Sequence, residues 1–234
     1  MRPTRALTNG PEPIDGLIFD FDGVLVDSDP LHAEAYRRAF EAHGIRMSLA
    51  DYVERAKGLG RSEVVALFGA ELGPREREDV ARIKTLEAQR LIREGGLAPV
   101  EAVIPFLRSA RARGFACAVA STSEIAGFAV ESLGLTALFD CVCAKRPEDR
   151  AKPHPDVFLR AIAGLDRTPA RCLVVEDTPI GVRAARAAGA RVVVRGCEAD
   201  WTDGPHAQDV LGYFSCYRAL HRAFEWGPLE ETGS

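Results

Sequence analysis

Two aspartates, one residue apart, follow the first apolar run of the chain. Asp20 and Asp22 flank Phe21 in the segment FDFDGVLVDS, residues 19–28, which begins where the run GLIF ends. If the run forms a strand, both carboxylates leave it on the same side, and Gly23 permits a tight turn behind them. Carboxylates this close repel each other, so a neighbouring cation or lysine is needed to keep them ionised.

Three more apolar runs end in side chains that bind anions or cations. The residues concerned are Ser121, Thr122 and Ser123 after the second run, Lys152 after the third, and Glu176 and Asp177 at the end of the fourth. Ligands of open parallel sheets bind beyond the carboxyl ends of the strands, so all four places are expected to share one site. Acidic oxygen ligands suit Mg²⁺, while an ammonium group, hydroxyls and the N–H groups of a helix start suit a phosphate. Each piece alone also fits a turn or a helix cap, so the prediction of a magnesium and phosphate site rests on the four together.

The runs that carry these residues alternate with helical patterns, which is typical of a parallel sheet covered on both faces. The expected strands are residues 16–20, 115–120, 139–144, 172–176 and 191–195. Helices with capping residues and a closing glycine are expected over residues 28–44, 123–134, 155–164 and 178–189. The predicted fold class is α/β, with a Rossmann-like parallel sheet core and helices on both faces.

A stretch without strand patterns interrupts the alternation after the first strand. Residues 28–96 show several helical patterns, so an inserted all-helical domain is expected there. The core is then made of residues 14–27 and 97–234, and residues 1–13 are expected to form a disordered leader. The part after Gly196 is less clear, with a last strand or helix within residues 209–224.

Composition and charge exclude several classes of function. The 234 residues are 47% hydrophobic and 27% charged, with a formal net charge of -4, so the chain can bury a core and has no basic stripe for nucleic acid. No run approaches the roughly 18 apolar residues that a membrane span requires. The 6 cysteines lack the paired spacing of a disulfide framework or a zinc site, which favours reduced thiols in the cytoplasm. A small molecule is the expected partner, and the oligomeric state is left open.

Two segments are specific enough to indicate a family. FDFDGVLVDS resembles the DxDGxxxDS pattern of the haloacid dehalogenase superfamily, and VVEDTPIGVRAARAAGA resembles its fourth motif. Ser121 and Lys152 stand at the places of the shorter second and third motifs, and the resemblance covers residues 14–195. Most members of this superfamily are Mg²⁺-dependent phosphotransferases. The resemblance implies that the inserted helices form a cap, which closes over the site and selects the substrate.

The resemblance also implies a role for each residue of the site. Asp20 would attack phosphorus to form an aspartyl-phosphate, and Asp22 would protonate the leaving oxygen and later deprotonate water. Ser121 and Lys152 would hold the transferred phosphoryl group, with Thr122 and Ser123 beside them. The implied Mg²⁺ ligands are Asp20, the backbone carbonyl of Asp22 and Asp177, with Glu176 in the first or second shell.

Within the cap, the segment KGLGRS, residues 57–62, resembles the substrate-specificity loop of β-phosphoglucomutase. This implies that Gly58 and Arg61 bind the substrate, with the arginine gripping its distal group. His32 and Lys84 are further cap residues for which two interpretations stay open, approach to the site or packing elsewhere.

The expected function is a Mg²⁺-dependent phosphatase acting on a small phosphorylated metabolite, a sugar phosphate or a phosphoglycolate-like acid. In β-phosphoglucomutase a lysine and an asparagine follow the second motif and hold a second phosphate, whereas this chain has Glu124 and Ile125 there. An anion at that place disfavours a bisphosphate intermediate, so a mutase is the alternative. A non-catalytic phosphate-binding protein is less favoured because both aspartates of the first motif are present. Halide displacement is disfavoured because the founding dehalogenases lack the second aspartate.

Overall fold

The computed structural model describes residues 12–57, 59–197, 210–226 and 229, and within them six strands form one sheet. The strand order is β3-β2-β1-β4-β5-β6, and all neighbouring strands are parallel. The strands are β1 (Gly16–Phe19), β2 (Ala116–Ala120), β3 (Cys141–Cys143), β4 (Cys172–Glu176), β5 (Arg191–Arg195) and β6 (Tyr213–Phe214). The first five lie within two residues of the predicted strands at each end, so the predicted α/β, Rossmann-like sheet is confirmed.

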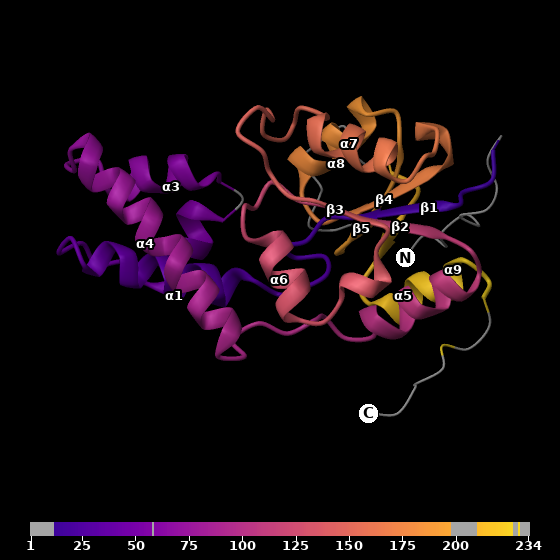
Figure 1. Cartoon of the computed structure of the whole chain (residues 1–234), viewed down its shortest axis with the longest axis horizontal. Helices are drawn as coiled ribbons and strands as arrows, with labels where there is room; N and C mark the ends of the chain where they lie inside the picture. The colour runs from indigo at the N-terminus through magenta and orange to yellow at the C-terminus, as the bar shows by residue number, and fades with distance from the viewer. Residues whose placement is uncertain (1–11, 58, 198–209, 227–228, 230–234) are drawn as a thin grey trace.

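Helices cover both faces of the sheet (Figure 1). One face carries α5 (Val103–Ala112), α6 (Ala126–Ser132) and α9 (Tyr217–Ala223), and the other carries α7 (Asp156–Gly164) and α8 (Pro179–Ala187). Two 3-10 turns, η2 (Thr136–Leu138) and η3 (Pro169–Arg171), precede β3 and β4. Leu17 and Phe19 of β1 pack in the apolar cluster with α5 and α9, whereas Ile18 packs in the cluster with α7 and α8. Burial on both faces explains why the strands are almost wholly apolar.

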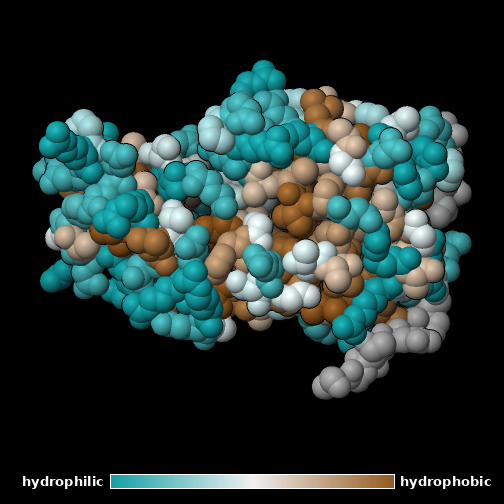
Figure 2. All heavy atoms as spheres, viewed as in Figure 1, coloured by the Kyte–Doolittle hydropathy of each residue, from teal (hydrophilic) through white to brown (hydrophobic). Residues whose placement is uncertain are grey.

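The predicted inserted helices lie together to one side of the sheet (Figure 1). They are α1 (Asp29–Glu41), α2 (Leu49–Asp51), the π-helical turn η1 (Tyr52–Ala56), α3 (Arg61–Phe68) and α4 (Pro74–Arg93). These elements share an apolar cluster of their own, which includes Tyr36, Phe40 and Val64. Figure 2 shows hydrophilic side chains over most of this part, while apolar side chains gather toward the middle of the same face, near α6.

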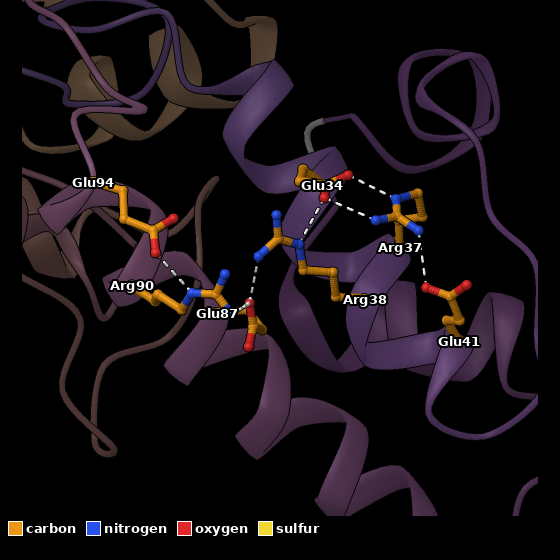
Figure 3. Close-up of polar contacts among 7 residues, drawn as sticks. All are labelled: Glu34, Arg37, Arg38, Glu41, Glu87, Arg90 and Glu94. Atoms are coloured by element: carbon orange, nitrogen blue, oxygen red, sulfur yellow. Dashed lines mark hydrogen bonds and ion pairs between the residues drawn. The ribbon is translucent and has the colours of Figure 1, made fainter.

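Several ion pairs lie along one side of α1 and α4, and one of them joins the two helices (Figure 3). Glu34 accepts hydrogen bonds from both Arg37 and Arg38, and Arg38 Nη1 reaches Glu87 Oε2 of α4 at 2.9 Å. Arg37 also contacts Glu41 on α1, and Arg90 of α4 contacts Glu94, the residue after this helix. Pairs of this spacing within one helix stabilise it only slightly, so the contact that matters for the arrangement is the one between Arg38 and Glu87.

The chain enters and leaves the inserted helices through neighbouring connections. Val26 forms an antiparallel bridge with Pro99, and the Val100 N–H donates to the Leu25 carbonyl at 2.9 Å. The boundaries predicted at residues 28 and 96 stand close to this bridge and stay a prediction.

The C-terminal part contains both a strand and a helix. Strand β6 adds to the sheet beside β5, and α9 places Tyr217 and Leu220 in the apolar core. The sequence pattern left a choice between these two elements because a strand of two residues is too short to show a period. Most of the predicted leader, residues 1–11, lies outside the described residues.

Candidate active site

Asp20 directly follows the last residue of β1, a central strand of the sheet. The predicted site residues at four strand ends were expected to meet here. Its N–H donates to the Val175 carbonyl of β4 at 3.0 Å, so the backbone is still held by the sheet. Lys152 Nζ donates to Asp20 Oδ1 at 2.8 Å and to Glu176 Oε1 at 2.6 Å. All three side chains are buried, so the structure brings together residues from the ends of three different strands in one charged cluster.

Glu176 ties this cluster to the start of α8. Its Oε2 accepts hydrogen bonds from the N–H groups of Asp177 and Thr178 and from the Thr178 hydroxyl. The same hydroxyl accepts from the Gly181 N–H and so caps the helix, as the sequence predicted for Thr178. A Cβ on Gly181 would lie 1.7 Å from Glu176 Oε1, so only glycine leaves room for the carboxylate.

A second glycine allows the first and fourth loops to touch. Gly23 has a φ of +72°, and a Cβ there would lie 2.0 Å from Asp177 Oδ2. Arg195 Nη1 donates to the Gly23 carbonyl at 2.6 Å, and the Tyr217 hydroxyl donates to the Val24 carbonyl at 3.2 Å. Arg195 and Tyr217, which hold the turn after Asp20 from β5 and α9, were not found from the sequence.

The carboxylates of Asp20, Glu176 and Asp177 lie close enough together that they could hold a metal ion. Each offers an oxygen within 4.8 Å of the others. Among the described residues, the buried Asp177 Oδ1 has no hydrogen-bond partner. A buried oxygen without a donor, beside two more carboxylates, fits a hard divalent cation such as Mg²⁺. The Asp22 side chain points to other partners, and its backbone carbonyl stays a predicted ligand.

Burial dominates the electrostatics of this carboxylate group. It raises the pKa of Asp20 to about 7, against the opposing charge of Lys152, and the charges of Glu176 and Asp22 add to the increase. Burial together with Glu176 and Asp20 raises the pKa of Asp177 to about 8. The pKa of Lys152 is also raised, because its two carboxylate partners outweigh its burial. Lys152 alone therefore does not balance the three acidic groups, and a bound cation would.

Asp22 has a separate set of partners that comes from the cap. Its Oδ1 accepts from the Ser28 hydroxyl at 2.5 Å and lies 3.1 Å from His32 Nε2. His32 Nδ1 lies 3.2 Å from Lys84 Nζ. A neutral imidazole satisfies both contacts when Nε2–H donates to Asp22 and Nδ1 accepts from the ammonium group. The structure thus favours approach to the site over packing elsewhere for both His32 and Lys84.

These contacts set the charge of Asp22. Burial alone would raise its pKa, but the His32 ring and the hydrogen bonds from His32 and Ser28 outweigh it, and the pKa is lowered. Burial lowers the pKa of Lys84 to about 8, and the Asp22 charge partly opposes this. Asp20 and Asp22 therefore have different surroundings although one residue separates them.

The loop after β2 places Ser121 one strand away from Asp20. Ser121 is buried, its N–H donates to the Cys143 carbonyl, and its Oγ accepts from the Ser123 N–H at 3.0 Å. The predicted helix start at residue 123 is wrong, because α6 begins at Ala126. The serine side chain takes up a backbone N–H and favours a turn over a helix at this point. Thr122 and Ser123 are half-buried in that turn.

Arg61 is at the first position of α3 and points to the loop after β2. Its guanidinium contacts Glu124 with Nη1–Oε2 of 2.6 Å and Nη2–Oε1 of 2.8 Å. Gly58, the other predicted substrate-binding residue of the cap, lies outside the described residues.

Comparison with known proteins identifies the family. A model of haloacid dehalogenase-like hydrolases matches residues 14–189. The chain belongs to the haloacid dehalogenase-like hydrolase family. The resemblance inferred from the first and fourth motifs is thereby confirmed, and the chain is a hydrolase. The inserted helices occupy the place of the cap in this hydrolase.

Two relatives and a solved structure illustrate the similarity. This hydrolase is 33% identical over 192 residues to protein CbbY of Rhodobacter capsulatus, which covers 77% of this chain and 85% of the relative. It is 33% identical over 177 residues to the fructose-1-phosphate phosphatase YqaB of Escherichia coli K12, covering 74% of this chain and 92% of the relative. The crystal structure of CbbY from Rhodobacter sphaeroides with xylulose-1,5-bisphosphate has a TM-score of 0.74 at 27% identity, and covers 87% of this chain and 95% of that chain. None of the helices in the described residues of the hydrolase is long and apolar enough to cross a membrane.

The raised carboxyl pKa values predict how the stability of this hydrolase depends on pH. Asp20 and Asp177, raised from 3.8 to about 7 and about 8, bind protons in the folded state that the unfolded chain releases. The free energy of unfolding of the metal-free protein should therefore fall as pH rises from about 4 to about 8, by about 1 kcal/mol or more between pH 6 and pH 8. Mg²⁺ favours the ionised carboxylates, so saturating Mg²⁺ should reduce this fall.

Urea unfolding at pH 6 and pH 8, with EDTA or with Mg²⁺, measures the effect. Asp177→Asn removes one of the titrating groups and serves as the comparison. In EDTA, the unfolding free energy of this variant should fall less between pH 6 and pH 8 than that of the wild type. If the unfolding free energy changes equally between pH 6 and pH 8 for the wild type and for this variant, in EDTA and in Mg²⁺ alike, the assignment is contradicted.

Proposed function

We propose that this chain is a Mg²⁺-dependent phosphatase that hydrolyses a small sugar phosphate or a phosphoglycolate-like acid through an aspartyl-phosphate on Asp20. The observation that carries the proposal is the pairing of two unlike aspartates at one strand end. Asp20 lies with Lys152 and two further carboxylates, whereas Asp22 is held by Ser28 and His32 of the cap. A nucleophile and an acid–base group need such different surroundings.

In the first step, an Asp20 carboxylate oxygen forms a bond to phosphorus as the bond between phosphorus and the leaving oxygen breaks. Asp22 gives its proton to that leaving oxygen. Lys152 and the Ser121 hydroxyl bind the phosphoryl oxygens and offset the charge that develops on them. A Mg²⁺ ion bound by Asp20, Glu176 and Asp177 would supply further positive charge beside the phosphate.

In the second step, Asp22 takes a proton from a water molecule, and the water oxygen bonds to phosphorus. The bond between phosphorus and Asp20 breaks, which restores the free carboxylate and releases inorganic phosphate. Asp22 is a carboxylate once it has protonated the leaving oxygen, so it can accept the proton of the water in this step. His32 holds Asp22 from the cap, so cap closure and the proton transfers are linked by one hydrogen bond.

The relatives support sugar phosphates as the substrate class, since one is a fructose-1-phosphate phosphatase and a related structure holds a sugar bisphosphate. The mutase alternative requires the enzyme to retain a bisphosphorylated sugar. Glu124 places an additional anion near the Ser121 loop, which favours the phosphatase over the mutase.

A phosphate-release assay tests the proposal. Purified protein is incubated with p-nitrophenyl phosphate and with a panel of sugar monophosphates and phosphoglycolate, in Mg²⁺ or in EDTA. We expect release from at least one metabolite, and a rate in EDTA lower by about a hundredfold or more. Equal rates in EDTA would contradict the metal dependence. Conversion of one sugar phosphate to an isomer, faster than phosphate release, would support the mutase instead.

A further inference from the structure

An ion pair joins the cap to the loop that carries Ser121. Arg61 Nη1 donates to Glu124 Oε2 at 2.6 Å, and Arg61 Nη2 donates to Glu124 Oε1 at 2.8 Å. The two residues are 63 positions apart in the sequence, and each side chain is partly exposed. A bidentate pair of this kind fixes the plane of both groups, which a single contact does not.

The cap orients Arg61 before it reaches Glu124. Arg61 Nη1 donates to Thr85 Oγ1 of α4 at 3.1 Å, and the Thr85 hydroxyl itself donates to the Ala81 carbonyl at 3.1 Å. The threonine proton is therefore used, and its oxygen presents a lone pair to the guanidinium. These contacts occupy three of the five N–H groups of an arginine, which leaves Nε–H and one Nη2–H for other partners.

The ion pair between Arg61 and Glu124 limits which substrate groups can bind beside Arg61. A second phosphate approaching Arg61 would have to displace the Glu124 carboxylate or lie against it. Displacement of Glu124 breaks the bidentate hydrogen bonds, and a phosphate that lies against Glu124 is repelled by its like charge. A hydroxyl group neither displaces Glu124 nor is repelled by it, because it accepts a hydrogen bond from a remaining N–H of Arg61 and donates one to a Glu124 oxygen.

We propose that the Arg61–Glu124 pair is a specificity element that selects sugar monophosphates over the corresponding bisphosphates. Arg61 then contacts the distal part of the substrate through its remaining N–H groups, and the distal part carries hydroxyls. The proposal deepens the phosphatase function and rests on it.

Matched substrates test the pair directly. Fructose 1-phosphate and fructose 1,6-bisphosphate differ by one phosphate, and corresponding glucose and xylulose compounds extend the set. The readout is the ratio of kcat/KM for monophosphate to bisphosphate, which a general loss of activity does not change. We expect the wild type to favour the monophosphate by about tenfold or more, and Glu124→Lys to lower this ratio by about tenfold or more, with Glu124→Gln between them. Glu131→Lys makes the same charge change at an exposed position of α6 and should leave the ratio unchanged.

Removal of both charges, by Arg61→Gln together with Glu124→Gln, distinguishes this proposal from direct binding of a second phosphate. We expect the ratio of this double variant to fall below that of the wild type, because the selective pair is gone. If Arg61 exchanges Glu124 for a substrate phosphate, the double variant loses bisphosphate hydrolysis selectively and its ratio rises above that of the wild type, which overturns the proposal. A wild type that prefers bisphosphates overturns it as well. Calorimetric binding of the matched sugar phosphates to an Asp20→Asn variant gives a second measurement of the same preference. A protein that binds monophosphates selectively but releases no phosphate from any substrate contradicts the phosphatase function and leaves the role of the pair supported.

Discussion

Replacement of Asp20 by asparagine will lower kcat for phosphate release by at least about a thousandfold, because the variant lacks the carboxylate that forms the bond to phosphorus. The change keeps the shape of the side chain and removes a buried charge. The pKa of Asp20 is raised to about 7, so the charged form is disfavoured where it lies. The free energy of unfolding of the metal-free variant above pH 7 should therefore equal or exceed that of the wild type.

Two measurements accompany the rate. Acid quenching during turnover should leave one phosphoryl group on the wild-type protein, mapped to Asp20, and none on the variant. Asp166→Asn makes the same chemical change at an exposed residue and should keep full activity. Turnover of the folded Asp20→Asn protein at the wild-type rate would rule out Asp20 as the nucleophile.

Replacement of Lys152 by methionine will affect both activity and stability. The methionine keeps most of the volume of the buried stem but removes the ammonium group that contacts Asp20 at 2.8 Å and Glu176 at 2.6 Å. Loss of a preorganised positive charge beside the phosphoryl group should lower kcat/KM by about a hundredfold or more. Leaving two buried carboxylates without their cation should cost about 3 kcal/mol of unfolding free energy at pH 8 without metal.

The pH dependence separates the two effects. Without Lys152 the pKa of Asp20 rises further, so the stability of the variant should recover as pH falls from 8 to 6, because protonation removes a buried charge. Its activity should not recover over the same range, since the ammonium group is absent at every pH. Lys145→Met, in the loop after β3, is the matched control. Unchanged kcat/KM for Lys152→Met would remove the residue from the phosphate site.

The strands and the charged centre of the site could be predicted because they depend on local signals. A short apolar run followed by a polar residue indicates both a buried strand and its carboxyl end, and parallel strands place those ends together. Asp20, Lys152 and Glu176 were found in this way, and they are in direct contact. The loop after β2 was harder to predict, since the Ser123 N–H bonds to the Ser121 side chain and α6 begins only at Ala126.

The contacts that support the site could not be predicted because they join distant parts of the chain. Arg195 donates to the Gly23 carbonyl, which lies 172 residues earlier in the sequence, and no local sequence pattern indicates this partner. The same is true of Arg61, whose place in the specificity segment suggested a substrate contact, while its pairing with Glu124 depends on how the cap lies on the sheet. Glu124 was recognised from the sequence only as a departure from the family pattern.

The bridge between Val26 and Pro99 has a consequence for how this enzyme could be re-engineered. Because the two ends of the insertion are adjacent, a different helical module could be grafted at the same points without stretching the chain. Such an exchange would not be neutral for the chemistry, since His32 and Ser28 would leave together with the old module and Asp22 would lose both donors. A chimera of this kind would inherit the nucleophile intact and would have to bring its own groups to orient the acid–base aspartate.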